Sequence, residues 1–132
     1  MKMNIITEKG YVDYAERVIK SLKERRDDRG KPIVIITTSK IRNLLAMSAD
    51  IYNVVIADTN EELSKEVCSR TEYLRMRFVY EAGRDGSVKK FVEEAKLLDI
   101  LKQIDGKKAN FILFNHYMEA LVAFHRYYGG KD

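Results

Sequence analysis

The segment from Lys108 to Tyr128 constrains the possible folds of this chain more than any other. If it is a helix, apolar and aromatic side chains cover nearly its whole circumference, and Glu119 and Arg126 are its only charges between Asn110 and Tyr128. Such a helix is either the central helix of a fold or a contact between subunits, because its apolar sides have to be covered. The segment therefore predicts a fold or an assembly built around the last helix.

Four earlier segments show the apolar spacing of amphipathic helices. They cover about 11–26, from 37–39 to about 55, from 59–60 to about 82, and from 85–87 to about 105. We expect Gly83 to end the third of these helices, a turn to span 83–86, and Asp85 or Ser87 to cap the fourth. Together with the last segment, the pattern predicts an all-α fold, a compact bundle of about five helices. The length of 132 residues indicates a single domain.

The predicted domain has an N-terminal part, 1–36, and a helical core, 37–132. The N-terminal part holds the first helix and a polar linker, 27–31, followed by the only proline, Pro32. The run Ile33–Ile36 reads as a strand, but no second strand of similar quality exists to pair with it, and an isolated strand is unstable. We therefore expect a buried extended connector or an extra helical turn. The apolar surplus also predicts self-association, and one route is a mobile N-terminal part that is exchanged between copies.

The net charge of +4 is modest, but it is unevenly distributed. Residues 67–90 carry six basic and three acidic side chains, which makes a local basic patch. The patch predicts weak, salt-sensitive affinity for nucleic acid when the chain is alone. No apolar run is long enough to span a membrane, residues 1–10 lack the apolar core of a signal peptide, and the single Cys68 fits a reducing compartment. We therefore expect a cytoplasmic protein with no membrane partner.

An arginine row stands out in the third predicted helix. Arg70, Arg77 and Arg84 are spaced by seven residues, so on a helix they form one stripe that drifts only about 20° per step. Tyr73 and Tyr80 lie on one side of this stripe. The planar guanidinium of arginine binds phosphate through two hydrogen bonds. The row therefore suits contact with a phosphate backbone, and the alternative is that these arginines pair with carboxylates or lie in water.

Two more cations, Lys40 and Arg42, stand at the start of the second predicted helix. Positive charge is unfavourable at the N-terminal end of a helix dipole. We therefore expect an anionic partner for this pair.

No catalytic or metal-binding constellation emerges from the sequence. His116 and His125 are nine residues apart on the last helix and point to roughly opposite sides, so they cannot hold a metal together. No HExxH, CxxC or glycine-rich phosphate motif is present. Cys68 has no indicated base beside it and is expected to be an inert thiol. We therefore expect no catalytic residues, no metal and no cofactor.

Two further signals leave alternatives open. The segment Gly83–Gly86 precedes a helix and can bind an anion there, although a turn that only caps the helix is favoured. His125 and Tyr128, beside Arg126, can stack on bases or belong to the core or an interface.

Four segments together resemble a known family, Csm2, the small helical subunit of the type III-A CRISPR effector called the Csm complex. They occur in order and cover 37–132, whereas residues 1–36 carry little resemblance to the family. The segments are Thr-Thr-Ser-Lys-Ile-Arg-Asn-Leu-Leu (37–45), Tyr-Leu-Arg-Met-Arg-Phe-Val-Tyr-Glu-Ala-Gly-Arg-Asp (73–85), the stretch from Val-Lys-Lys-Phe to Ala-Lys-Leu (88–97), and Tyr-Met-Glu-Ala-Leu-Val-Ala-Phe-His-Arg-Tyr-Tyr-Gly-Gly-Lys-Asp (117–132).

The resemblance implies a non-catalytic subunit that stacks in several copies with the other Csm subunits, along the channel where target RNA pairs with the CRISPR guide RNA. Contacts would be to the phosphate backbone, because guide pairing already reads the sequence. Carried over by motif, the RNA-facing cations are Lys40, Arg42, Arg75, Arg77 and Arg84, with Lys89, Lys90 and Arg126 as secondary candidates.

Three hypotheses follow from the sequence. The first is this non-enzymatic, RNA-binding scaffold. The second is a helical protein-interaction or homodimerisation module with no direct RNA contact, in which the arginines form salt bridges. The third is a small enzyme that uses Cys68 or His125.

Overall fold

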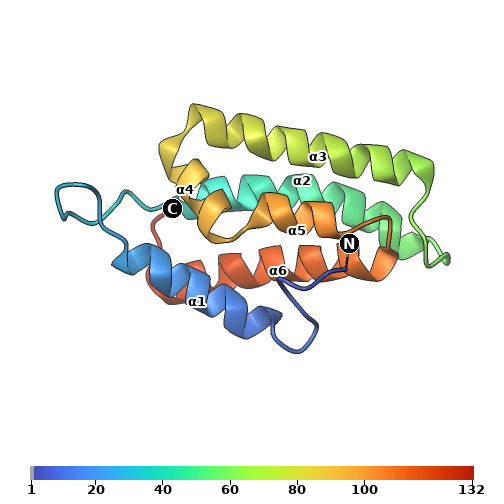
Figure 1. Ribbon diagram of the computed structural model, residues 1–132, viewed down its shortest axis with the longest axis horizontal. Coiled ribbons are helices and arrows are strands. Elements are labelled where there is room, and N and C mark those ends of the chain that lie inside the picture. The colour runs from blue at the N-terminus through green and yellow to red at the C-terminus, as the bar shows by residue number, and fades with distance from the viewer. Residues whose placement is uncertain (1) are drawn as a thin grey trace.

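The computed structural model describes residues 2–132. Over this range the chain is helical, and two isolated β-bridges are its only β-structure. Figure 1 shows three long helices, α2, α3 and α6, along the longest dimension of the molecule, with α1 lying obliquely against α6. The predicted all-α, single-domain fold is confirmed, with six helices in this range instead of about five. They are α1 Tyr11–Glu24, α2 Thr38–Ala57, α3 Lys65–Arg84, α4 Gly86–Glu94, α5 Leu97–Gln103 and α6 Lys108–Tyr127.

The last helix, α6, is the central helix of the bundle. It packs against α1, α2 and α5, which together cover most of its circumference. This confirms the first of the two roles expected for a helix that is apolar on nearly all sides. Its buried side chains are Phe111, Leu113, Phe114, Asn115, Tyr117, Met118, Leu121 and His125.

The N-terminal helix, α1, packs against α6 of the same chain. It ends at Glu24, two residues before the expected end. In the linker that follows, the carboxylate of Asp27 accepts hydrogen bonds from the backbone N–H groups of Arg29 and Lys31, each at 2.9 Å. Exchange of this N-terminal part between copies stays a prediction. The residues that α1 buries are Ala15, Val18, Ile19 and Leu22.

The run Ile33–Ile36 contains neither helix nor strand, so it is not the extra helical turn, and the expected buried connector is confirmed only in part. Ile33 and Ile36 are buried, whereas 78% of Val34 is exposed. The connector therefore anchors the chain between α1 and α2 through two isoleucines and leaves one valine in solvent.

His125, near the C-terminal end of α6, joins this connector to the start of α2. Since a carbonyl oxygen only accepts, Nε2–H of His125 donates to the Ile36 carbonyl at 2.7 Å, and Nδ1 accepts from the Thr38 hydroxyl at 2.9 Å. The backbone of Gly130 lies so close that a Cβ there would stand 2.1 Å from the imidazole. Burial lowers the pKa of His125, which keeps the ring neutral at pH 7. His125 is therefore a core residue and not a stacking platform for bases.

The expected start of the third helix, at residues 59–60, is wrong. α3 begins at Lys65, because the backbone before it bonds to the loop between α5 and α6. The N–H of Leu63 donates to the carbonyl of Gly106 at 2.8 Å, and the N–H of Lys108 donates to the carbonyl of Glu61 at 2.9 Å. These groups are paired across two loops and are not available for the first turn of a helix.

The expected stop at Gly83 is also wrong. α3 continues to Arg84 and α4 begins at Gly86, so Asp85 alone separates the two helices. The backbone of Gly83 does not adopt the left-handed conformation that ends many helices, and so nothing local interrupts α3 there.

The fourth predicted helix is in fact two helices, α4 and α5. The chain breaks at Lys96, whose φ of 57° is left-handed. The carbonyl of Ala95, at the break, accepts a hydrogen bond from the buried Tyr117 hydroxyl at 2.8 Å. Periodicity could not show this break, because apolar residues on both of its sides keep nearly helical spacing.

Candidate nucleic-acid interface

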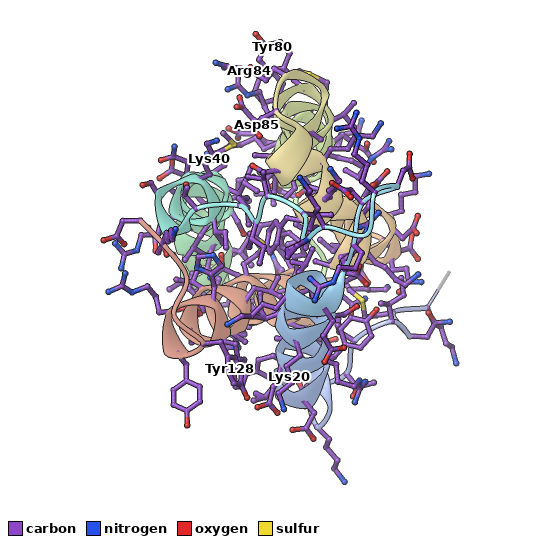
Figure 2. All side chains as sticks on the ribbon, turned by 90° about the vertical axis from the view of Figure 1, so that its left-hand side faces the viewer. Lys20, Lys40, Tyr80, Arg84, Asp85 and Tyr128 are labelled. Carbon is purple, nitrogen blue, oxygen red and sulfur yellow. The ribbon has the colours of Figure 1, made fainter. Side chains whose placement is uncertain are left out.

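Three of the predicted cations, Lys40, Arg77 and Arg84, line one open cleft between α2 and α3 of about 540 Å³, here called the α2–α3 cleft. Lys40 comes from the first turn of α2, and the two arginines come from the second half of α3. Figure 2 shows Lys40 and Arg84 on one side of the molecule with Tyr80 and Asp85, and Lys20 on the opposite side. The cleft is also lined by Asn43, Leu44, Met47, Glu81, Asp85 and Val88.

Asp85 is the anionic partner expected for Lys40. Its Oδ2 lies 2.5 Å from Lys40 Nζ. Its Oδ1 caps α4 by accepting from the backbone N–H groups of Ser87 at 2.9 Å and Val88 at 3.4 Å. The hydrogen bond from Lys40, supported by those from Ser87 and Val88, holds the pKa of Asp85 well below its usual range. The segment Gly83–Gly86 therefore presents its own carboxylate to the start of α4, which supports the capping turn over an external anion.

Replacing Asp85 by alanine is expected to lower the free energy of unfolding by about 1 kcal/mol, because α4 loses its cap. Asn is also a good cap, so Asp85→Asn should lose only the pairing with Lys40. The folded pKa of Asp85 is depressed, so its contribution is present above the unfolded pKa and disappears as the pH falls below about 4. Thermal unfolding of both variants at neutral and acidic pH checks this. Equal stability of Asp85→Ala and the wild type would contradict the capping role.

Arg77 and Arg84 are held by one carboxylate and one aromatic ring. Arg77 Nη2 lies 3.3 Å from Glu81 Oε2, and Arg84 Nη1 lies 3.7 Å from Glu81 Oε1. Both guanidinium groups also lie over the ring of Tyr80, at 5.5 and 5.8 Å from its centroid. The two arginine side chains stay 38% and 63% exposed. Exposed pairs of this kind contribute little to stability, so the guanidinium groups can exchange Glu81 for a phosphate.

The remaining predicted cations on α2 and α3 do not reach the cleft. Arg75 Nη2 pairs with Glu72 Oε2 at 2.7 Å along α3. Arg42 is exposed on α2 and has no charged partner among residues 2–132. Among the described residues, the anionic partner expected at the start of α2 is therefore found for Lys40 and not for Arg42. Arg70, the first member of the arginine row, lines a neighbouring hollow.

The three secondary candidates also lie outside the cleft. Lys89 is exposed and Lys90 is half-buried, both on α4. Arg126, near the end of α6, lies 2.6 Å from Asp132 Oδ1. The structure thus brings together three of the eight predicted cations.

Sequence reasoning missed the two carboxylates of the cleft, Glu81 and Asp85. The spacing of Glu81 from Arg77 and Arg84, four and three residues, is the usual spacing of helical ion pairs and could have revealed it. Asp85 and Lys40 are 45 residues apart in the chain, and no local pattern signals their contact.

The two histidines and Cys68 all make contacts within the helical bundle. Both ring nitrogens of His125 are hydrogen-bonded inside the core. His116 packs against the rings of Tyr11 and Tyr52. Cys68 is half-buried on α3, with its Sγ 3.8 Å from the carbonyl oxygen of Leu63. Within the described range, no three side chains of His, Cys, Asp or Glu gather in a way that could hold a metal ion.

None of the helices between residues 2 and 132 has the length and apolar character needed to cross a membrane.

Comparisons with known proteins point to one family. The family model described as Csm2 Type III-A matches residues 13–131. A protein of Streptococcus thermophilus named CRISPR system Cms protein Csm2 is 41% identical over 130 residues, which are 98% of this chain and 100% of that protein. Proteins of the same name occur in Mycobacterium tuberculosis, with 36% identity over 122 residues (92% and 94% of the two chains), and in Enterococcus italicus, with 35% identity over 128 residues (92% and 91%).

These matches extend the resemblance seen in the sequence. The similarity includes most of α1 and the linker, so the N-terminal part contributes more family signal than its motifs suggested. The chain belongs to the Csm2 family of type III-A CRISPR systems.

Proposed function

We propose that this chain is a non-catalytic small subunit of the type III-A Csm complex, working in the cytoplasm. It stacks in several copies with the other Csm subunits and contacts the backbone of the target RNA where it pairs with the guide RNA. The observation that carries the RNA contact is the convergence of Lys40, Arg77 and Arg84 on the α2–α3 cleft. Membership of the Csm2 family supports the place in the complex.

The shape and charge of the cleft suit a backbone contact. Its cations come from two packed helices, so their separation is fixed by the bundle and not by a flexible loop. The guanidinium groups of Arg77 and Arg84 can each donate two hydrogen bonds to one phosphate. These contacts would position an RNA strand without reading its sequence, which guide pairing already does.

Co-expression tests the place in the complex. The chain is produced with the other Csm subunits and a guide RNA, with the affinity tag on a different subunit. We expect it to co-purify in more than one copy per complex, as judged by the mass of the intact assembly. If the chain never associates, the proposed function is wrong, and a free-standing helical RNA binder or homodimer becomes the better interpretation.

The second candidate is a protein-interaction module with no RNA contact. It is favoured by the exposed apolar side chains Met76 and Val79 on α3 and by the pairing of Arg77 and Arg84 with Glu81. Under this interpretation, loss of the two arginines would release the subunit from the complex. Under the first, it would reduce RNA binding and leave the complex assembled.

A further inference from the structure

Two tyrosines on α3 offer their rings to solvent beside the arginine row. Tyr73 is 60% exposed and Tyr80 is 54% exposed, although tyrosine rings carry large apolar surfaces that usually become covered. The two residues are seven apart, so they lie on one side of α3 and are separated by about 10 Å along its axis. At that separation the two rings cannot sandwich a single planar group, so each ring would stack on a different planar group.

Each ring has two arginines of the same helix beside it, and these outnumber the carboxylate found there, Glu81 near Tyr80 and Asp50 near Tyr73. Arg77 and Arg84 both lie over the ring of Tyr80, which restricts how the ring can turn. Tyr73 lines a hollow of about 550 Å³ together with Arg70 and Arg77, with Asp50 as the one acidic residue of its lining. Each exposed ring therefore stands beside two guanidinium groups of the same helix.

A nucleobase next to its own phosphate matches this pairing of ring and cation. Aromatic side chains stack on bases regardless of sequence, while cations follow the backbone of the same strand. Bases inside a continuous duplex are stacked on each other and cannot reach a protein ring, whereas unpaired or displaced bases can. The charge beside the rings therefore favours a strand with accessible bases over an apolar protein surface.

We propose that Tyr73 and Tyr80 are stacking platforms for unpaired bases of the RNA strand whose phosphates occupy the arginine row. This inference rests on the proposed RNA contact and gives it a preference for RNA with accessible bases over a continuous duplex. Met76 and Val79 are also exposed on α3, but they line neither the α2–α3 cleft nor the hollow beside Tyr73. They have no role in the proposed stacking.

The test uses the full chain at low salt with a single-stranded RNA of about 12 nucleotides, and the same strand in a fully paired duplex. Replacing both tyrosines by alanine is expected to weaken binding of the single strand about 30-fold or more and to leave duplex binding unchanged. The salt dependence should stay the same, because no phosphate contact is removed. A 2-aminopurine base in the single strand should lose its binding-induced quenching with the alanine variant.

Two matched variants complete the test. Tyr73→Phe with Tyr80→Phe keeps the rings and should bind like the wild type, and Met76→Ala with Val79→Ala removes exposed apolar groups of the same helix without effect on RNA. The inference would be overturned if the alanine variant bound the single strand as tightly as the wild type does, or if it lost affinity for the single strand and the duplex by the same factor. So would an alanine variant that binds RNA normally but leaves the Csm complex, which would indicate a protein partner.

The failure of this inference can be told apart from failure of the proposed function. If Arg77→Ala with Arg84→Ala weakens RNA binding while the tyrosine variants do not, only the stacking role is wrong. If neither pair of substitutions changes RNA binding, the proposed RNA contact and the stacking role are both wrong, while the place in the complex is tested by the co-expression experiment.

Discussion

Replacing Arg77 and Arg84 together by alanine is expected to weaken the binding of target RNA by the assembled complex about 100-fold, with the subunit still incorporated. A hydrogen bond to a charged group contributes about 1.5–3 kcal/mol, and about 1.4 kcal/mol corresponds to a tenfold change in affinity. Both guanidinium groups are largely free to reach an incoming phosphate, since their partner Glu81 holds them only in exposed pairs. The combined loss should therefore be large, although the two arginines share Glu81 and the Tyr80 ring and so need not act additively.

The salt dependence of binding separates this effect from general damage to the subunit. Each phosphate contact that is lost should reduce the slope of log affinity against log salt by about one, so the double variant should lose about two. Arg17→Ala with Lys20→Ala removes the same charge from α1, and Figure 2 shows Lys20 on the opposite side of the molecule. This control should retain both affinity and slope.

A substitution in the same cleft is expected to have the opposite effect on RNA binding. Glu81→Gln releases both arginines from their carboxylate and removes a negative charge from the α2–α3 cleft, so it should strengthen RNA binding and steepen the salt dependence. Unchanged affinity in the arginine variant, with the subunit still in the complex, would show that the cleft does not contact RNA. Loss of the subunit from the complex would support the protein-interaction alternative.

His125→Ala is expected to lower the free energy of unfolding by about 3 kcal/mol. The substitution leaves the buried carbonyl of Ile36 and the hydroxyl of Thr38 without their partner, and each unsatisfied buried group costs about 1–3 kcal/mol. For a domain of this size, such a loss lowers the melting temperature by about 10 °C. Thermal unfolding monitored by circular dichroism measures it. His116→Ala, at a half-buried site where the ring packs against Tyr11 and Tyr52, should cost much less.

The buried, neutral His125 should also make the stability of the protein depend on pH. Because burial lowers the pKa of His125, the unfolded chain binds a proton at a higher pH than the folded chain. The stabilising contribution is therefore complete above about pH 6.5 and is lost as the pH falls toward the folded pKa. Wild-type stability should decrease between about pH 7 and 5 more steeply than that of His125→Ala. Parallel curves for the two proteins would contradict the buried, neutral imidazole.

The sequence predicted those features that depend on neighbours along the chain. The apolar circumference of α6 predicted a central helix or a subunit contact, and the sequence offered Asp85 or Ser87 as the cap of α4. The structure has the first member of each pair. The start of α3 could not be predicted, since Leu63 pairs with Gly106, which is distant in sequence.

In the candidate site, too, features within one helix were predictable and contacts between helices were not. The row of Arg77 and Arg84 is a property of one helix and was visible in the spacing. The contact that brings Lys40 to Asp85 depends on how α2 and α3 pack, and no periodic pattern encodes it. Arg75 was carried over with its motif, yet its position on α3 places it with Glu72 and outside the cleft.

The two carboxylates in the α2–α3 cleft have a consequence for selectivity. With Glu81 and Asp85 opposing Lys40, Arg77 and Arg84, the cleft of a single copy has little excess charge. One subunit alone should therefore compete poorly for the abundant ribosomal and messenger RNA of a cell. In the proposed assembly, copies arranged along one guide would multiply their weak contacts through high effective concentration, and this avidity would confine the protein to RNA already captured by base pairing.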